Sequence, residues 1–235
     1  MEWLSLLTVA VAPGLALLTY FYLKDRYVTE PIRAVASVFL LGMLVVFPIM
    51  IIQRGFILAF GENEWLFSFV ISAGIEEFFK WFIVYFFVFP SASFDEPYDG
   101  IVYAVASSIG FATVENLLHV LLNPYDLSSV IIRALLPVSA HALFGVVMGY
   151  FIGKAKFSET RKKLLLLASL AVPIFWHGWF DWILLTMTTS WYVWMAILMA
   201  VLWGVAIWKM NRALAVSPFR SLHREEEVNI FMNGQ

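Results

Sequence analysis

Carboxylates, histidines and one lysine occur in the middle of stretches that are otherwise apolar enough to span a membrane. In chain order they are Glu76, Glu77, Lys80, Glu115, His141, His177 and Asp181. A charged side chain near the bilayer centre costs about 2.5 to 3.5 kcal/mol on insertion scales, so its presence there needs a reason. The default reason is a functional interior site, and acids with histidines can activate water or hold a metal ion.

The residues around Glu76 share one region of a helix surface. Ser72, Glu76 and Lys80 are four residues apart, and Glu77 reaches Lys80 at a spacing of three. One lysine can therefore neutralise one of two adjacent acids, which leaves the other as a candidate general base or acid. A buried ion pair that only orients this helix is the alternative interpretation.

A further acid, Glu115, lies in the next apolar stretch. Asn116 stands beside it and offers a hydrogen-bonding amide to the interior, so we assign supporting roles to Asn116 and Lys80. His119 follows Glu115 at a spacing that suits a pair of metal ligands. Its place near the helix end favours an interfacial position instead.

The two remaining histidines lie on helix faces that favour burial. His141 begins a run with a spacing of four whose other members are Gly145, Gly149 and Gly153. Small residues at this spacing are typical of helix packing in membranes, so His141 should face neighbouring helices. Asp181 follows His177 by one turn, where a carboxylate can hold an imidazole in one tautomer. A single buried histidine is usually only hydrogen-bonded, but two with several acids favour a site.

The elements that must position these side chains are membrane-spanning helices. Hydrophobic residues make up 62% of the 235 residues, and the mean hydropathy is +0.83, both far above the range of soluble globular proteins. The formal net charge of −2 is spread between loops, which argues against a nucleic-acid partner. The absence of cysteine excludes disulfides, thiol nucleophiles and thiolate metal ligands.

Apolar runs of about 20 residues predict seven spanning helices. They cover residues 3–23, 34–53, 65–89, 100–121, 130–152, 164–186 and 190–208. The expected fold class is an all-α polytopic membrane protein, with a single membrane domain over 1–208 and a polar cytoplasmic tail over 209–235. Twelve of the fifteen lysines and arginines follow the first, fifth and seventh helices. The positive-inside rule then places the N-terminus outside and the C-terminus in the cytoplasm.

This topology predicts the depth of each polar residue. At about 1.5 Å per residue, Glu76 and His141 lie roughly 17 Å from the outer ends of their helices. Glu115 and His177, counted from the cytoplasmic ends of theirs, fall at about 20 Å. All four positions belong to one layer in the extracytoplasmic half of the membrane, so we expect a single site.

Peptide-bond hydrolysis by water is the reaction that fits these residues. The helices contain no rhomboid-like Gly-x-Ser-Gly, no presenilin-type Gly-x-Gly-Asp and no His-Glu-x-x-His element. The remaining mechanism is attack by a water molecule that Glu76 or Glu77 activates, with His141 and His177 positioning the water or stabilising the oxyanion. The same water on a divalent metal such as zinc, held by histidine and carboxylate, fits equally well, so the cofactor stays open.

Two other functions use similar residues. Buried acids and histidines also build the proton relays of ion-coupled transporters. A scaffold or sensor could use the same polar network only to set helix packing. Loss of cleavage without loss of folding on substitution of the acids would separate a protease from both.

The sequence resembles the PrsW family of bacterial membrane proteases, distant relatives of the CAAX-type prenyl endopeptidases. The resemblance covers about residues 20–185. It rests on Glu76-Glu77-Phe78-Phe79-Lys80, Phe111 with Glu115-Asn116, Ser139-Ala140-His141 with Gly145, and His177-Gly178 with Asp181. Loop segments also match, namely Asp25-Arg26-Tyr27 with Glu30-Pro31, and Asp95-Glu96-Pro97-Tyr98-Asp99-Gly100 with Tyr103.

This resemblance implies a multi-pass protease of the bacterial plasma membrane. It would make the extracytoplasmic site-1 cut in a single-pass anti-sigma factor and so start regulated proteolysis that releases a sigma factor under envelope stress. The wider superfamily has an arginine after its two glutamates, a histidine in its second element and an amide in its last. Here Lys80, Glu115 and Asp181 stand at those places, which leaves open which residue activates water.

Overall fold

The computed structural model describes residues 2–61, 63–122, 131–132 and 135–220, and these contain helices and no strands. The helices are α1 (Glu2–Leu23), α2 (Ile32–Leu44), α3 (Val46–Phe60), α4 (Glu64–Leu66), α5 (Ala73–Ile83), α6 (Asp99–Leu122), α8 (Pro137–Lys156), α9 (Lys162–Thr186) and α10 (Trp191–Ala215). Two π-helical segments, η1 (Phe67–Ser72) and η2 (Val84–Val88), flank α5. Arg133 and Arg224 of the predicted charge balance, and the tail from residue 221, lie outside the described residues.

The predicted all-α polytopic membrane fold is confirmed. The expected spans correspond to α1, α2 with α3, the continuous stretch Glu64–Val88, α6, α8, α9 and α10. Five described segments are long and apolar enough to cross a membrane: Ile32–Phe60, α6, α8, α9 and α10. α10 continues to Ala215, past the start of the predicted tail, and the division into domain and tail stays a prediction.

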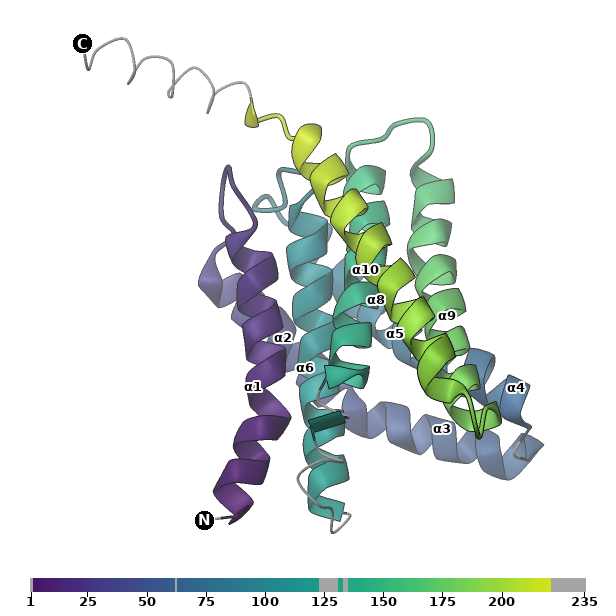
Figure 1. Ribbon diagram of the computed structural model, residues 1–235. Helices are drawn as coiled ribbons and strands as arrows, with labels where there is room; N and C mark the ends of the chain where they lie inside the picture. Colours follow the sequence, from purple (N-terminus) through teal and green to yellow (C-terminus); the bar gives the residue numbers. More distant parts are fainter. Residues whose placement is uncertain (1, 62, 123–130, 133–134, 221–235) are drawn as a thin grey trace, which may run out of the picture.

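The second predicted span is not one straight helix. It breaks at Val45, and α3 then lies across the end of the bundle instead of continuing along α2 (Figure 1). Pro48 accounts for the break, because its ring would clash with the carbonyl of Leu44 and it has no N–H to donate. α3 therefore packs against η1 and α5, next to the residues of interest.

The centre of the molecule is formed by α6 and α8, which are enclosed by the other helices (Figure 1). Their backbones touch where Gly149 faces Gly100. A Cβ atom added to Gly149 would lie 2.1 Å from the carbonyl oxygen of Gly100, so no side chain fits there. The glycine stripe that follows His141 is therefore a packing face, as predicted.

The connections of the bundle gather at its two ends. Residues 24–31, 89–98 and 157–161 lie at the same end as the C-terminal part of α10, which we call the loop end (Figure 1). Those basic residues after the first, fifth and seventh predicted helices that the structure describes belong to this end. By the positive-inside rule, this end is predicted to face the cytoplasm.

Candidate active site

The α5 helix carries three buried ionisable side chains that contact one another. Lys80 Nζ lies 2.8 Å from Oε1 of Glu77 and 3.5 Å from Oε2 of Glu76. The predicted ion pair therefore forms, and Lys80 binds Glu77 more closely than Glu76. The π-helical segments on both sides of α5 add a further sign, since such widened turns are frequent at functional sites.

The imidazole of His177, from α9, lies against both glutamates. Its Nδ1 is 2.9 Å from Oε1 of Glu77, and its Nε2 is 3.8 Å from Oε2 of Glu76. Because an ionised carboxylate only accepts hydrogen bonds, Nδ1 donates to Glu77 and Nε2 is left facing Glu76. Asp181, the expected partner of the ring, lies 3.5 Å from Nε2, so Glu77 is the closer carboxylate.

The imidazole of His141, from α8, bridges α5 and α6. Its Nδ1 is 3.0 Å from Nζ of Lys80, and its Nε2 is 3.1 Å from Oε2 of Glu115. A lysine ammonium only donates, so Nδ1 accepts and the ring proton is on Nε2, which donates to Glu115. The contacts thus select one tautomer of His141 and bring Glu115 into the site.

Aromatic rings surround the two imidazoles. Phe144 stacks on His177 with ring centres 4.9 Å apart, and Phe111 meets His141 edge-on at 5.4 Å. Nζ of Lys80 lies 4.2 Å from the centre of the Phe111 ring. These walls exclude water from one side of the cluster, and charges interact more strongly in such a low-dielectric setting.

Gln53 of α3 belongs to the site and was not among the residues predicted for it. Its Nε2 donates to Oε1 of Glu76 at 3.1 Å and lies 3.3 Å from the carbonyl oxygen of Ile71. Ser72 Oγ also donates to Oε1 of Glu76, at 3.4 Å. The only signal in the sequence was a lone amide near the end of an apolar run. The break at Val45 is what brings it to the site.

A cavity of about 260 Å³ opens onto this cluster between α3 and α6. Glu76 and Glu115 line it, together with Gln53, Phe111 and His119. His119, expected at the interface, thus borders the site entrance. Glu77 and Lys80 are wholly buried behind Glu76 and do not line the cavity.

Asn116 is the one predicted site residue that the structure places elsewhere. Its Nδ2 donates to the carbonyl oxygen of Ala10 at 2.9 Å, so it joins α6 to α1. The reason is helical geometry, because neighbouring residues on a helix point about 100° apart. Glu115 faces His141, and Asn116 consequently faces α1.

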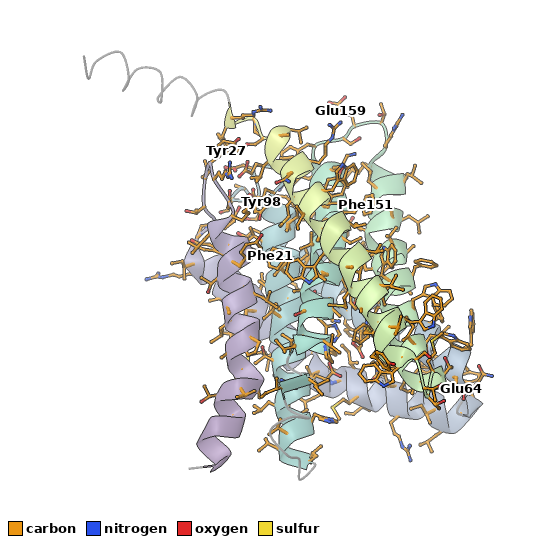
Figure 2. The ribbon with its side chains drawn as sticks, in the orientation of Figure 1. Phe21, Tyr27, Glu64, Tyr98, Phe151 and Glu159 are labelled. Carbon is orange, nitrogen blue, oxygen red and sulfur yellow. The ribbon has the colours of Figure 1, made fainter. Side chains whose placement is uncertain are left out.

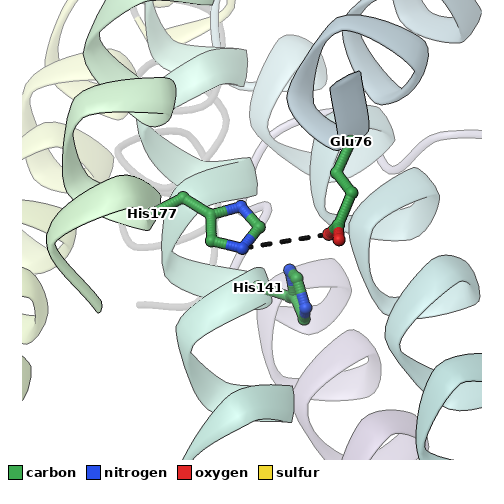
Figure 3. Close-up of side chains that lie close together, drawn as sticks. All are labelled: Glu76, His141 and His177. Carbon is green, nitrogen blue, oxygen red and sulfur yellow. Dashed lines mark ion pairs between the residues drawn. The ribbon is translucent and has the colours of Figure 1, made fainter. Parts of the chain in front are cut away.

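Three of these side chains could hold a metal ion. Glu76, His141 and His177 each offer a ligand atom, and these atoms all lie within 4.8 Å of one another (Figure 3). Two imidazoles and one carboxylate are a donor set of catalytic zinc sites, where a fourth position remains for water. Glu77, which holds Nδ1 of His177, would then act as the outer carboxylate that orients a ligand histidine.

A helical membrane bundle in which carboxylates and histidines gather beside an open cavity fits the class of membrane-embedded hydrolases. Comparison with known protein families supports this class and identifies the family. Residues 30–207 match the family described as "PrsW family intramembrane metalloprotease". The chain belongs to this family, and it is a membrane protease of the bacterial plasma membrane.

Relatives named Protease PrsW are similar over most of their lengths. The protein of Geobacillus kaustophilus is 49% identical, over 89% of this chain and 92% of its own. The protein of Bacillus subtilis is 44% identical, over 91% of this chain and 97% of its own. The protein of Clostridioides difficile is 32% identical, over 88% of this chain and 89% of its own. No solved structure matches the chain.

Proposed function

We propose that Glu76 activates the water that attacks the substrate's peptide bond. The observation that carries this assignment is the unequal pairing of two adjacent acids. Oε1 of Glu77 is held by both Lys80 and His177, and the Glu77 side chain is fully buried. Glu76 lines the cavity, and its Oε2 accepts no hydrogen bond from the described residues. Of these two adjacent acids, Glu76 is therefore the one that can meet both water and substrate.

The proton path follows from these contacts. Glu76 takes a proton from water as the water oxygen bonds to the carbonyl carbon of the peptide. Nε2 of His177 lies on the same side and orients that water. Nε2–H of His141 points towards the cavity-lining Glu115 and is the donor best placed for the oxyanion. Glu76 then passes its proton to the amide nitrogen as the C–N bond breaks.

The family description favours a metal ion at the same place, and Glu76, His141 and His177 would hold it. Such an ion would polarise the peptide carbonyl and lower the pKa of its water, and Glu76 would then serve as a ligand instead of as the general base. The protein's own contribution is to orient these ligands. Glu77 sets the tautomer of His177, and Gln53 holds Oε1 of Glu76 so that Oε2 faces the imidazoles.

The substrate that we propose is a single-pass anti-sigma factor, cut on its extracytoplasmic side as the first step of its regulated proteolysis. Two features support this. The cavity opens between α3 and α6, and α3 lies at the end of the bundle opposite the loop end (Figure 1). The site residues also lie on helices of the membrane bundle, where a substrate that itself enters the membrane can reach them.

Co-expression tests the proposal. A tagged single-pass anti-sigma factor is produced with the wild-type protein, with Glu76→Gln, or with Glu64→Gln as a matched control at an exposed acid of the same end. We expect a shortened, membrane-retained fragment with the wild type and the control only. Loss of general base catalysis should reduce cleavage about 10²- to 10⁴-fold.

Full cleavage by Glu76→Gln would exclude Glu76 as the base. A proton flux that depends on Glu76, with every candidate substrate left intact, would instead support an ion-coupled transporter. Equal protein levels and equal melting temperatures are required for each comparison.

A further inference from the structure

A second cluster of buried carboxylates lies outside the active site, at the loop end. Asp25 follows α1, Glu96 lies in the connection before α6, and Asp99 is the first residue of α6. One carboxylate oxygen of each lies within 4.8 Å of the others. Glu96 and Asp99 are wholly buried, and Asp25 is 5% exposed. Figure 2 shows the neighbouring Tyr27 and Tyr98 at this end of the bundle.

These carboxylates lack the partners that buried charges usually have. Both side-chain oxygens of Asp25, both of Glu96 and Oδ1 of Asp99 lack a well-aligned hydrogen-bond donor among the described residues. The nearest groups are the backbone N–H of Tyr27 beside Asp25 and the carboxyl group of Glu30 beside Asp99, and neither carries a positive charge. Within the described part of the chain none of the three forms a salt bridge. Lys156 of α8 donates to the carbonyl oxygens of Phe89 and Ser91 instead. Buried charges without partners are costly, and in proteins they are normally paired or bound to metals.

The surrounding backbone orients the cluster. Oδ2 of Asp99 accepts the backbone N–H groups of Asp95 and Glu96, each at 2.8 Å, so Oδ1 is the atom left for a ligand. Tyr98 donates from its hydroxyl group to the carbonyl oxygen of Phe21 at 3.1 Å, which attaches this connection to the end of α1. The carboxylates are thus held close together by bonds that do not neutralise them.

We infer that Asp25, Glu96 and Asp99 bind one hard divalent cation of the magnesium, manganese or calcium type. All the ligand atoms are carboxylate oxygens, which such ions prefer, and no nitrogen or sulfur ligand that would favour zinc belongs to the cluster. Bound there, the ion joins the α1–α2 connection to the start of α6. This site is separate from the proteolytic one and does not depend on the proposed reaction.

Protons are the competing way to neutralise the cluster. Burial, followed by the neighbouring Glu96 carboxyl group, raises the pKa of Asp25 to about 8. Burial also raises the pKa of Glu30, whose carboxylate accepts the Tyr103 hydroxyl nearby. A proton shared by two carboxyl groups bonds to only two carboxylate oxygens. One cation can bind oxygens from all three residues.

Thermal unfolding in detergent tests the inference, with MgCl₂, CaCl₂ or MnCl₂ added to metal-free protein. The variants are Glu96→Gln, which keeps the shape of the buried side chain, and Asp95→Asn, which removes a charge from its exposed neighbour. We expect at least one ion to raise the Tm of the wild type and of Asp95→Asn by roughly 5 °C at a hundredfold excess over Kd. Glu96→Gln should lose this rise.

Electron paramagnetic resonance with Mn²⁺ counts the bound ions independently of stability. The active-site residues are the same in all variants, so Glu96→Gln should bind about one ion fewer than Asp95→Asn. Asp25→Asn serves as the second variant if Glu96→Gln does not fold. Equal Mn²⁺ binding by all variants, or a wild type whose Tm does not respond to any of the three ions, would overturn the inference and leave protons as the neutralising species.

Discussion

Glu76 and Glu77 are adjacent in the chain but lie in different surroundings. Glu77 is enclosed by Lys80 and His177, whereas Glu76 lies at the cavity and is held through Oε1 by Gln53. Helical spacing could predict that one acid would be paired, but it could not say which. The answer depends on α9 and α3, whose positions relative to α5 are not encoded in the spacing of the residues on α5.

This division of roles predicts different results for the substitutions Glu76→Gln and Glu77→Gln. Glu76→Gln should reduce cleavage about 10²- to 10⁴-fold and leave the Tm nearly unchanged. Glu77→Gln should lose cleavage and also lower the free energy of unfolding by about 3 kcal/mol, because removing one partner leaves the Lys80 charge buried and poorly compensated. Cleavage assays and thermal unfolding of both purified variants check this. An equal loss of stability in the two would contradict the assignment.

Gln53 should matter for catalysis although it does not react. Gln53→Leu removes the hydrogen bond to Oε1 of Glu76 while keeping a side chain of similar size. A hydrogen bond to a charged group contributes about 1.5–3 kcal/mol, so we expect cleavage to fall roughly 10- to 100-fold. Cleavage kinetics would measure the change. Met50→Leu, at the same cavity, is the control and should retain activity.

Removal of metal should stop cleavage if Glu76, His141 and His177 hold a catalytic ion. A zinc-specific chelator is used with excess MgCl₂ and CaCl₂ present, so that hard divalent cations remain available to the carboxylate cluster at the loop end. We expect activity to disappear and to return when ZnCl₂ is added. Undiminished activity after chelation would favour the metal-free mechanism, in which Glu76 alone activates water.

At the scale of elements, the hydrophobic runs predicted the helices well, because seven spans need only length and composition. They did not predict the break between α2 and α3, although Pro48 was a visible signal within the second run. The π-helical turns of η1 and η2 had no signal in the sequence. Gln53 was therefore missed for a reason of geometry, since a straight second helix would not have placed α3 against α5.

The contact between α6 and α8 makes a further prediction. Gly149→Ala would place a Cβ atom 2.1 Å from the carbonyl oxygen of Gly100, and the two helices would have to separate. Such overpacking should destabilise the protein by about 1–3 kcal/mol. Gly204→Ala in α10 is the matched control, because no atom lies within 4 Å of its new Cβ. Thermal unfolding should show a lower Tm for Gly149→Ala only.

At the scale of the whole molecule, the basic residues predict which end faces the cytoplasm. The absence of cysteine allows a direct test, because a single introduced cysteine is the only reactive thiol. Glu64 and Glu159 are exposed at opposite ends of the bundle (Figure 2). In intact cells a membrane-impermeant maleimide should label Glu64→Cys, and it should label Glu159→Cys only after permeabilisation. The reverse pattern would invert the topology and place the cavity towards the cytoplasm.

The break at Val45 has a consequence for the lipid around the protein. α2 has 13 residues and is therefore only about 20 Å long, whereas the hydrocarbon core of a bilayer is about 30 Å thick. Lipids beside so short a helix adapt by thinning, which draws their headgroups inward. We expect the outer leaflet to dip over α3, so that water reaches Glu76 through a deformed membrane surface. The rate of cleavage should then depend on the thickness of the bilayer that surrounds the enzyme.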